Sequence, residues 1–180
     1  QHFLRSQQQY EDPVLAWHIQ KNLARVYEEQ QAWEEALQIY AKMDDHENQV
    51  RLLIQTGFIF IQSGRILSLA SWLDKLPVDA VYSQPVLISL LGIIYATRGD
   101  NHQALKNLYL AEAKLLEAGN EVEWATTLVR RAEIHRQLNQ FDQTLADVEK
   151  VLELFKESTN PELQSNFAEA QRIKGLALFA

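Results

Sequence analysis

Small residues recur at a fixed interval along this chain of 180 residues, and this recurrence constrains the fold more than any other feature. Ala36, Ala70 and Ala104 lie 34 residues apart, and Ala24 and Gly92 lie 68 residues apart, which is twice that interval. An interval of this length holds one helical hairpin, and a single hairpin cannot bury its own apolar face. The chain is therefore predicted to stack several hairpins, with the small residues where two helices approach closely.

The residues around these positions match a known repeat, in which the first helix carries Leu-Gly-x-x-Tyr and the second carries Ala-x-x-x-aromatic. The copies are Leu23-Ala24-x-x-Tyr27 with Ala36-x-x-x-Tyr40, Leu91-Gly92-x-x-Tyr95 with Ala104-x-x-x-Leu108, a weaker Arg131-Ala132-x-x-His135 with Thr144-x-x-x-Val148, and the half copy Lys174-Gly175-x-x-Leu178. The chain thus resembles the tetratricopeptide family, whose period is also 34 residues. This resemblance implies an all-α, right-handed superhelical solenoid of antiparallel helix hairpins.

Apolar residues recur at intervals of three and four residues between glycine and proline breaks, as in the stripe Leu15, Ile19, Leu23 and Val26. This periodicity predicts helices at about 13–30, 33–43, 46–56, 58–63, 65–76, 85–98, 101–118, 121–138, 141–157 and 160–180. The second unit, residues 47–77, is irregular because Phe58 stands where a small residue belongs. The residues predicted to end helices in the left-handed conformation are Gly64, Gly99 and Gly119.

Charge and composition argue against several classes of protein. The 17 basic residues are scattered among 24 acidic ones and the net charge is −7, so we expect no direct nucleic-acid binding. The absence of cysteine excludes disulfides and thiolate metal sites, and fits a reducing, cytoplasmic location. The longest apolar run, from Val86 to Ala96, is much shorter than a bilayer span, so no membrane partner is expected.

Neither the histidines nor the carboxylates have a spacing that predicts catalysis. No two of the five histidines have ligand spacing on one helix face, so we expect no metal. Acidic pairs such as Glu34-Glu35 fall on solvated helix faces, whereas a catalytic carboxylic acid needs an apolar pocket. There is no G-x-S-x-G elbow and no phosphate-binding loop. The chain is therefore predicted to be a non-enzyme without a cofactor, in which His135 packs at the aromatic position of its repeat.

First helices line the concave face of a tetratricopeptide solenoid, and this register selects a set of candidate ligand- or partner-binding residues. They are Arg25, Ser89, Arg130, Glu133, Arg136, Gln137, Glu169 and Arg172. The cluster of Arg130, Glu133, Arg136 and Arg172 could bind a carboxylate, a phosphate or sugar hydroxyls. The alternative is a solvated face with helix-spaced pairs such as Glu133–Arg136. Trp124 has two similar interpretations, an exposed binding residue or, with more weight, a core residue.

The irregularities resemble a narrower group, the sensor solenoids of large bacterial signal-transducing ATPases that include the maltose-system transcriptional activator and its LuxR-type relatives. The resemblance lies in Ala24 to Leu37, in Ser63-Gly64-Arg65 with Trp72 to Pro77, and in Gln84 to Leu87 with Gly99-Asp100. It implies a non-catalytic sensing domain of a multidomain bacterial transcriptional regulator, with a small-molecule inducer or a protein partner in the concave groove. The alternative is a general tetratricopeptide scaffold that binds a peptide or a helix there.

The same resemblance suggests a division of the chain. His2 to Arg5 are similar to the end of a linker domain, so residues 1–10 are expected to be its tail and residues 11–180 the solenoid. The last predicted helix carries Ile173, Leu176, Leu178 and Phe179 with no hairpin after it. Stacked repeats bury such a stripe against the next unit, so we expect a solenoid truncated at this end and self-association through the C-terminal helix.

Overall fold

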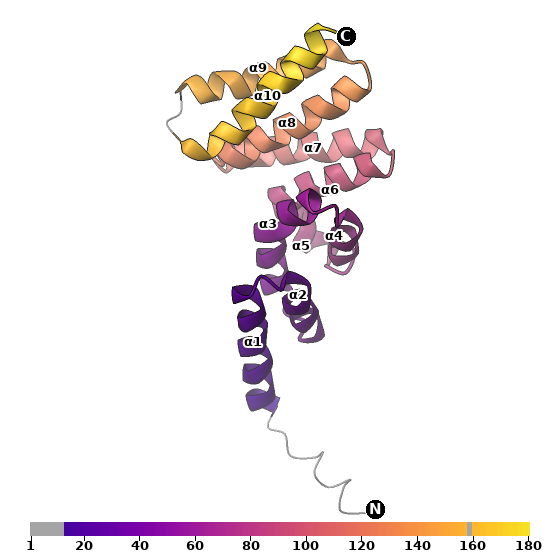
Figure 1. The fold of residues 1–180 in the computed structure, drawn as a ribbon. Helices are drawn as coiled ribbons and strands as arrows, with labels where there is room; N and C mark the ends of the chain where they lie inside the picture. Colours follow the sequence, from indigo (N-terminus) through magenta and orange to yellow (C-terminus); the bar gives the residue numbers. More distant parts are fainter. Residues whose placement is uncertain (1–12, 158–159) are drawn as a thin grey trace, which may run out of the picture.

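A computed structural model describes residues 13–157 and 160–180, and helices account for most of them. In chain order they are α1 (Pro13–Glu29), α2 (Trp33–Lys42), α3 (His46–Gln62), α4 (Ile66–Leu73), α5 (Val78–Tyr82), α6 (Pro85–Thr97), α7 (Asn101–Glu117), α8 (Glu121–Gln137), α9 (Phe141–Glu157), the 3-10 turn η2 (Pro161–Leu163) and α10 (Gln164–Leu178). No strand occurs within these described ranges. The helices stack from α1 at one end to α10 at the other (Figure 1), which confirms the predicted helical solenoid.

Polar caps and left-handed residues set the helix boundaries. Three helices begin where a side-chain oxygen accepts a hydrogen bond from the N–H three residues ahead, and the capping residues are Asp45, Asp100 and Asn120. The predicted left-handed glycines are confirmed at Gly64, Gly99 and Gly119. The same left-handed turn occurs without glycine at Gln31, Asp44 and Asn139. The sequence did not predict these three turns because none of the positions is a glycine. Asparagine and aspartate nevertheless tolerate this conformation better than most residues.

The second unit follows the repeat more closely than predicted, because its small residue is Gly57 and not Phe58. The predicted break between 56 and 58 was wrong, since α3 runs unbroken through Gly57. A β carbon on Gly57 would lie 2.3 Å from Leu90 Cδ1, so glycine at this position lets the Leu90 side chain of α6 pack directly on α3. Phe60 then fills the aromatic position and is fully buried.

Two other helix boundaries differ from the prediction. The helix predicted at 65–76 ends at Leu73, and a short helix that was not predicted, α5, follows Pro77. Proline fixes its own φ and has no N–H, so it starts a new helix more readily than it continues an old one. The helix predicted at 160–180 begins instead with η2, and α10 starts only at Gln164.

The core is divided along the solenoid, as expected for a stack in which each unit packs mainly on its neighbours. One apolar cluster contains residues from every helix between α1 and α6, and another contains residues from α8, α9 and α10. Between them, Gly92 of α6 packs against Leu108 of α7, and a β carbon at Gly92 would lie 2.6 Å from Leu108 Cγ. The small residues predicted at tight helix contacts are buried, namely Ala36, Ala70, Gly92, Ala104 and Ala132.

Two apolar stripes differ in their burial. On α1, the stripe that predicted the helix is largely exposed, at 58% for Leu15 and Ile19, because α1 packs mainly on α2. On α10, Ile173 is fully buried, whereas Leu176, Leu178 and Phe179 are exposed as predicted. The linker tail predicted at 1–10 lies outside the described residues. None of the helices described has the length and apolarity that a transmembrane span requires.

Candidate interaction groove

A groove runs between α8 and α10 and reaches α3. Its larger part has a volume of about 770 Å³ and is lined by Phe58 of α3, by Val122, Glu123, Thr126, Val129 and Arg130 of α8, and by Ser165, Asn166, Ala168, Glu169 and Arg172 of α10. A second hollow of about 360 Å³ shares Val129, Arg130 and Glu169 with it and extends to Ile93 and Thr97 of α6. We call these two hollows together the concave groove. Its walls combine apolar and charged side chains.

The helical period of α8 explains which of its side chains reach the groove. Ala125, Leu128 and Ala132 are fully buried on one side, in the core shared with α9 and α10. Arg130 lies two positions from Leu128 and from Ala132, and Glu133 comes directly after Ala132, so both point away from this buried side. Arg130 and Glu133 therefore line the groove.

Arg130 is the most unusual group in the groove. Its Nη1 donates a hydrogen bond of 2.8 Å to Ser89 Oγ, which lies 2.9 Å from Thr127 Oγ1. Burial lowers the pKa of Arg130, and the charge of Glu123 opposes this effect. Within the described residues no carboxylate lies at ion-pair distance from its guanidinium. A desolvated cation with hydrogen-bond donors unused is costly unless an anion or an acceptor approaches it.

The other charged candidates on α8 and α10 are already paired. Arg136 donates two hydrogen bonds to Glu133, at 2.9 and 2.7 Å, and Gln137 donates a third at 3.1 Å. Arg172 binds Glu169 in the same two-pronged way and lies 3.7 Å from Glu133. The hydrogen bonds from the arginines lower the pKa of Glu133 and Glu169. This is the helix-spaced pairing that was the alternative interpretation for these residues.

Two candidates lie apart from the groove surface. Ser89 is fully buried, so it supports Arg130 from beneath and cannot itself touch a ligand. Arg25 is exposed on α1 and lines neither hollow of the groove. Five of the candidates thus line the groove, namely Arg130, Glu133, Gln137, Glu169 and Arg172. Arg136 is not among the lining residues, and it donates a hydrogen bond to Glu133, which is.

Sequence reasoning missed Phe58, which is 51% exposed and lines the groove from α3. The signal was present: residues directly after a repeat's small residue point to the concave face, as Ile93 does after Gly92. The error of one residue in the register of the second unit hid it. With Gly57 as the small residue, Phe58 takes the position equivalent to Ile93.

A second polar cluster lies behind the groove and joins α7, α8 and α9. The guanidinium of Arg131 is buried and donates to both oxygens of Asp147, at 2.7 and 2.6 Å, and to Glu112. The ring of Tyr109 lies 4.0 Å from the guanidinium carbon. Burial alone would lower the pKa of Arg131, but the hydrogen bonds that Arg131 donates to the two carboxylates outweigh this effect and raise the pKa of Arg131. These contacts satisfy the guanidinium, so the cluster is structural.

His135 and Trp124 are packed side chains. His135 is buried beside Tyr109, and its Nδ1 lies 2.6 Å from Gln140 Oε1, as expected for a packed histidine. Trp124 is partly buried against two apolar clusters, and its indole N–H has no partner among the residues described. The part of the chain that the structure describes contains no group of three or more histidines and carboxylates suited to a metal ion.

The chain is similar to part of a known plant protein. The chain is 31% identical over 101 residues to Protein KINESIN LIGHT CHAIN-RELATED 1 from Arabidopsis thaliana. The match covers 51% of this chain and 17% of that protein, so the chain spans about a sixth of its relative's length. The structure shows an all-helical solenoid of stacked helices over the described residues. No family model matches it, and no solved structure matches it.

Proposed function

We propose that this repeat protein is a non-catalytic interaction module whose concave groove binds an acidic segment of a protein partner. The observation that carries the proposal is Arg130, a partly buried guanidinium that donates its hydrogen bond to a serine and has no carboxylate at ion-pair distance among the described residues. Neighbouring arginines on α8 and α10 already have carboxylate partners. An arriving carboxylate would supply the missing charge and could accept two parallel N–H bonds.

The walls of the groove define the rest of the partner segment. Phe58, Val122 and Val129 give it an apolar side next to Arg130. An apolar side chain adjacent to the acidic residue would bury these surfaces, and burial of apolar area drives most protein association. The preferred segment therefore has an aspartate or glutamate beside a large apolar residue.

A peptide-display selection on the whole chain tests this proposal. We expect the selected peptides to be enriched in an acidic residue beside an apolar one, and their affinity to fall about tenfold or more in Arg130→Gln, because a charged hydrogen bond contributes about 1.5–3 kcal/mol. Arg98→Gln is the matched control. Arg98 is exposed at the end of α6, and its Nη2 lies 3.9 Å from Asp74 Oδ2, which is a long ion pair. Selected peptides that bind Arg130→Gln as tightly as the unchanged protein would contradict the proposal.

The narrower proposal is that the module senses an inducer for a bacterial transcriptional regulator, as the resemblance of residues 24–37 and 63–77 implies. Support comes from the shortened helix α4 and the short helix α5, which follows Pro77 after the second unit. A thermal-shift screen with sugars and metabolites separates sensing from scaffolding, because a small ligand of the folded state raises the melting midpoint. The complete reading frame is expected to encode a G-x-x-x-x-G-K-[ST] phosphate loop, and a frame without one contradicts the regulator proposal.

A further inference from the structure

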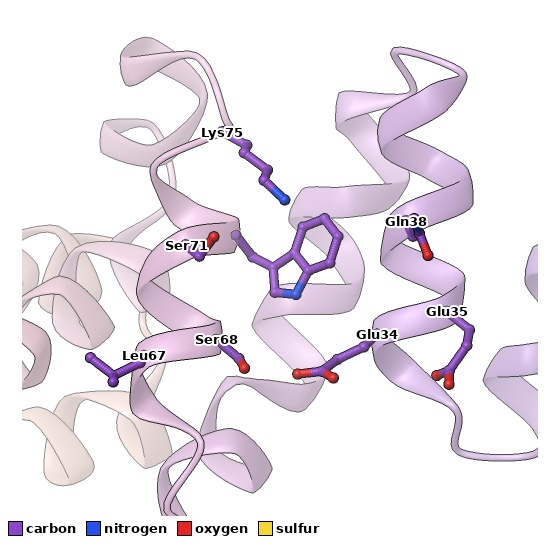
Figure 2. A pocket seen from close by; sticks show the side chains of 8 residues that line it. Glu34, Glu35, Gln38, Leu67, Ser68, Ser71 and Lys75 are labelled. Carbon is purple, nitrogen blue, oxygen red and sulfur yellow. The ribbon is translucent and has the colours of Figure 1, made fainter.

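A second hollow lies between α2 and α4, two helices that do not contribute to the concave groove. Both helices pack against α3, and between them they leave a volume of about 630 Å³. It is lined by Glu34, Glu35 and Gln38 of α2, by Leu67, Ser68, Ser71 and Trp72 of α4, and by Lys75 just beyond α4. Figure 2 shows the carboxylate of Glu34 extending from α2 toward Ser68 of α4.

The aromatic wall of this hollow already holds a cation. Lys75 Nζ lies 3.9 Å from the centre of the Trp72 ring. Such contacts arise because the ring face carries partial negative charge, and tryptophan is the strongest of the aromatic side chains in this respect. Trp72 itself is held in place, because it is partly buried against the core of the first units. The ring is therefore a fixed surface that attracts positive charge.

The opposite wall supplies an anion that is poorly satisfied. Glu34 Oε1 is buried and has no hydrogen-bond partner among the described residues, and its nearest cation, Arg65 Nη1, is 3.9 Å away. A buried carboxylate oxygen without a donor is a costly arrangement. Glu35 adds a second negative charge to the lining, against the single positive charge of Lys75. The negative charge of the lining, the aromatic face of Trp72 and the unsatisfied oxygen of Glu34 together favour a cation that donates hydrogen bonds.

We propose that this hollow binds an arginine side chain of a protein partner. A guanidinium is flat, so it can stack on Trp72, and its five N–H groups can reach a carboxylate and hydroxyl acceptors at the same time. The available acceptors are Glu34, Ser68 and Ser71. A quaternary ammonium group has no N–H and could not donate a hydrogen bond to any of them. The site shares no lining residue with the concave groove.

Titration with blocked arginine (N-acetyl-arginine amide), at constant ionic strength, tests the site, with the indole N–H signal of Trp72 in a nitrogen-correlated NMR spectrum as the readout. We expect a saturable shift, no shift with blocked citrulline, which has the same shape without the charge, and a weaker shift with tetramethylammonium. Glu34→Gln should weaken arginine binding about tenfold, because one charged hydrogen bond is lost. Lys75→Gln should preserve or strengthen it, since the competing cation is gone.

Two matched variants control this experiment. Glu117→Gln removes an exposed carboxylate on α7, and Arg130→Gln removes the anchor of the concave groove, so neither should alter arginine binding. An equal response to citrulline, an equal response to tetramethylammonium, or unchanged arginine affinity in Glu34→Gln would each overturn the proposal. Failure here would leave peptide binding in the concave groove unaffected, and loss of the groove in Arg130→Gln would leave this site intact.

Discussion

At the scale of single residues, two adjacent arginines on α8 have opposite environments. Arg131 is buried and satisfied by Asp147 and Glu112, whereas Arg130 donates to Ser89 and has no carboxylate at ion-pair distance in the described chain. Adjacent residues on a helix point about 100° apart, so one side chain enters the α7–α9 interface and the other enters the groove. The same residue type therefore serves stability at one position and recognition, as proposed here, at the next.

The first prediction concerns Arg131. Arg131→Gln should lower the free energy of unfolding at pH 7 by about 3–5 kcal/mol, because it leaves Asp147 and Glu112 without their buried partner. Arg136→Gln, which removes a partly exposed pair on the same helix, should cost about 0–1 kcal/mol. Urea denaturation of the three proteins measures the difference. Equal midpoints for the two variants would show that the buried cluster contributes nothing.

The pH dependence of this difference follows from Glu112. Burial alone would raise the pKa of Glu112, but hydrogen bonds and charges from Arg131 and Lys150 outweigh it and lower the pKa below its ordinary 4.5. A carboxyl group with a lowered folded pKa stabilises the fold fully above its unfolded pKa and loses that contribution as the pH falls. The stability gap between the unchanged protein and Arg131→Gln should therefore narrow as the pH drops below about 4.5. A gap that widens in acid would contradict this account.

The second prediction compares one substitution at two helical glycines. A β carbon at Gly92 would lie 2.6 Å from Leu108 Cγ, whereas at Gly175 nothing lies within 4 Å. Gly92→Ala should cost about 1–2 kcal/mol, because overpacking outweighs the gain in helix propensity. Gly175→Ala should be neutral or stabilise by up to about 1 kcal/mol. Thermal denaturation of the two variants measures the change in stability. A stabilised Gly92→Ala variant would show that α6 and α7 have room to separate.

At the scale of elements, α10 behaves as the end of the described stack. Its inner side, with Ala170 and Ile173, is buried against α9, and its outer side leaves Leu176 and Leu178 exposed, with Phe179 beyond it 94% exposed. Sequence periodicity showed that the helix is apolar but assigned Ile173 to the open side. The assignment needed the angle at which α10 crosses α9, and periodicity contains no information about that angle.

The third prediction is that this chain self-associates through that open side. Sedimentation at micromolar concentrations should show species larger than the monomer, because an exposed apolar patch favours association. Combining Leu176→Ser with Phe179→Ser should return the protein to a monomer. Leu116→Ser, which alters an exposed leucine on α7, is the control and should change nothing. A monomer in every case would show that the outer side of α10 is not an interface.

At the scale of the whole molecule, the solenoid is a row of neighbouring contacts. The strongest pairings join α6 to α7, α8 to α9 and α9 to α10, while α1 packs mainly on α2 and exposes a run of large apolar side chains. In such a row, the free energy of unfolding is close to the sum of the stability of each repeat and of its contacts with its neighbours. The two ends should therefore open independently of the centre.

The fourth prediction applies this to amide exchange. Backbone amides of residues 13–29 should exchange with solvent well before those of residues 101–117, because opening α1 breaks only its contacts with α2 and a few others. Hydrogen–deuterium exchange followed by mass spectrometry measures both segments in one experiment. Equal protection along the chain would instead indicate a single cooperative unit. In that case the division of the core into clusters would have no energetic meaning.

The repeat itself could be predicted because it depends on local chemistry. Small residues at a 34-residue interval, glycines that favour the left-handed conformation and apolar periodicity each act over a few residues, and each was readable at Ala36, Gly64 or Ala104. The register of the second unit was less secure, because Gly57 and Phe58 are adjacent and only the contact of Gly57 with Leu90 distinguishes them. That contact joins residues 33 positions apart, through two helices that must first be placed in space.

The candidate sites depend still more on the tertiary fold. The sequence placed Arg130, Glu133 and Arg172 on one face, but whether each has a partner depends on the distance between α8, α6 and α10. The hollow at Trp72 similarly exists because α2 and α4 both pack on α3 and leave a space between them. Local propensity sets where helices begin and which side is apolar. Helix packing alone decides which charges are neutralised and which remain open to a partner.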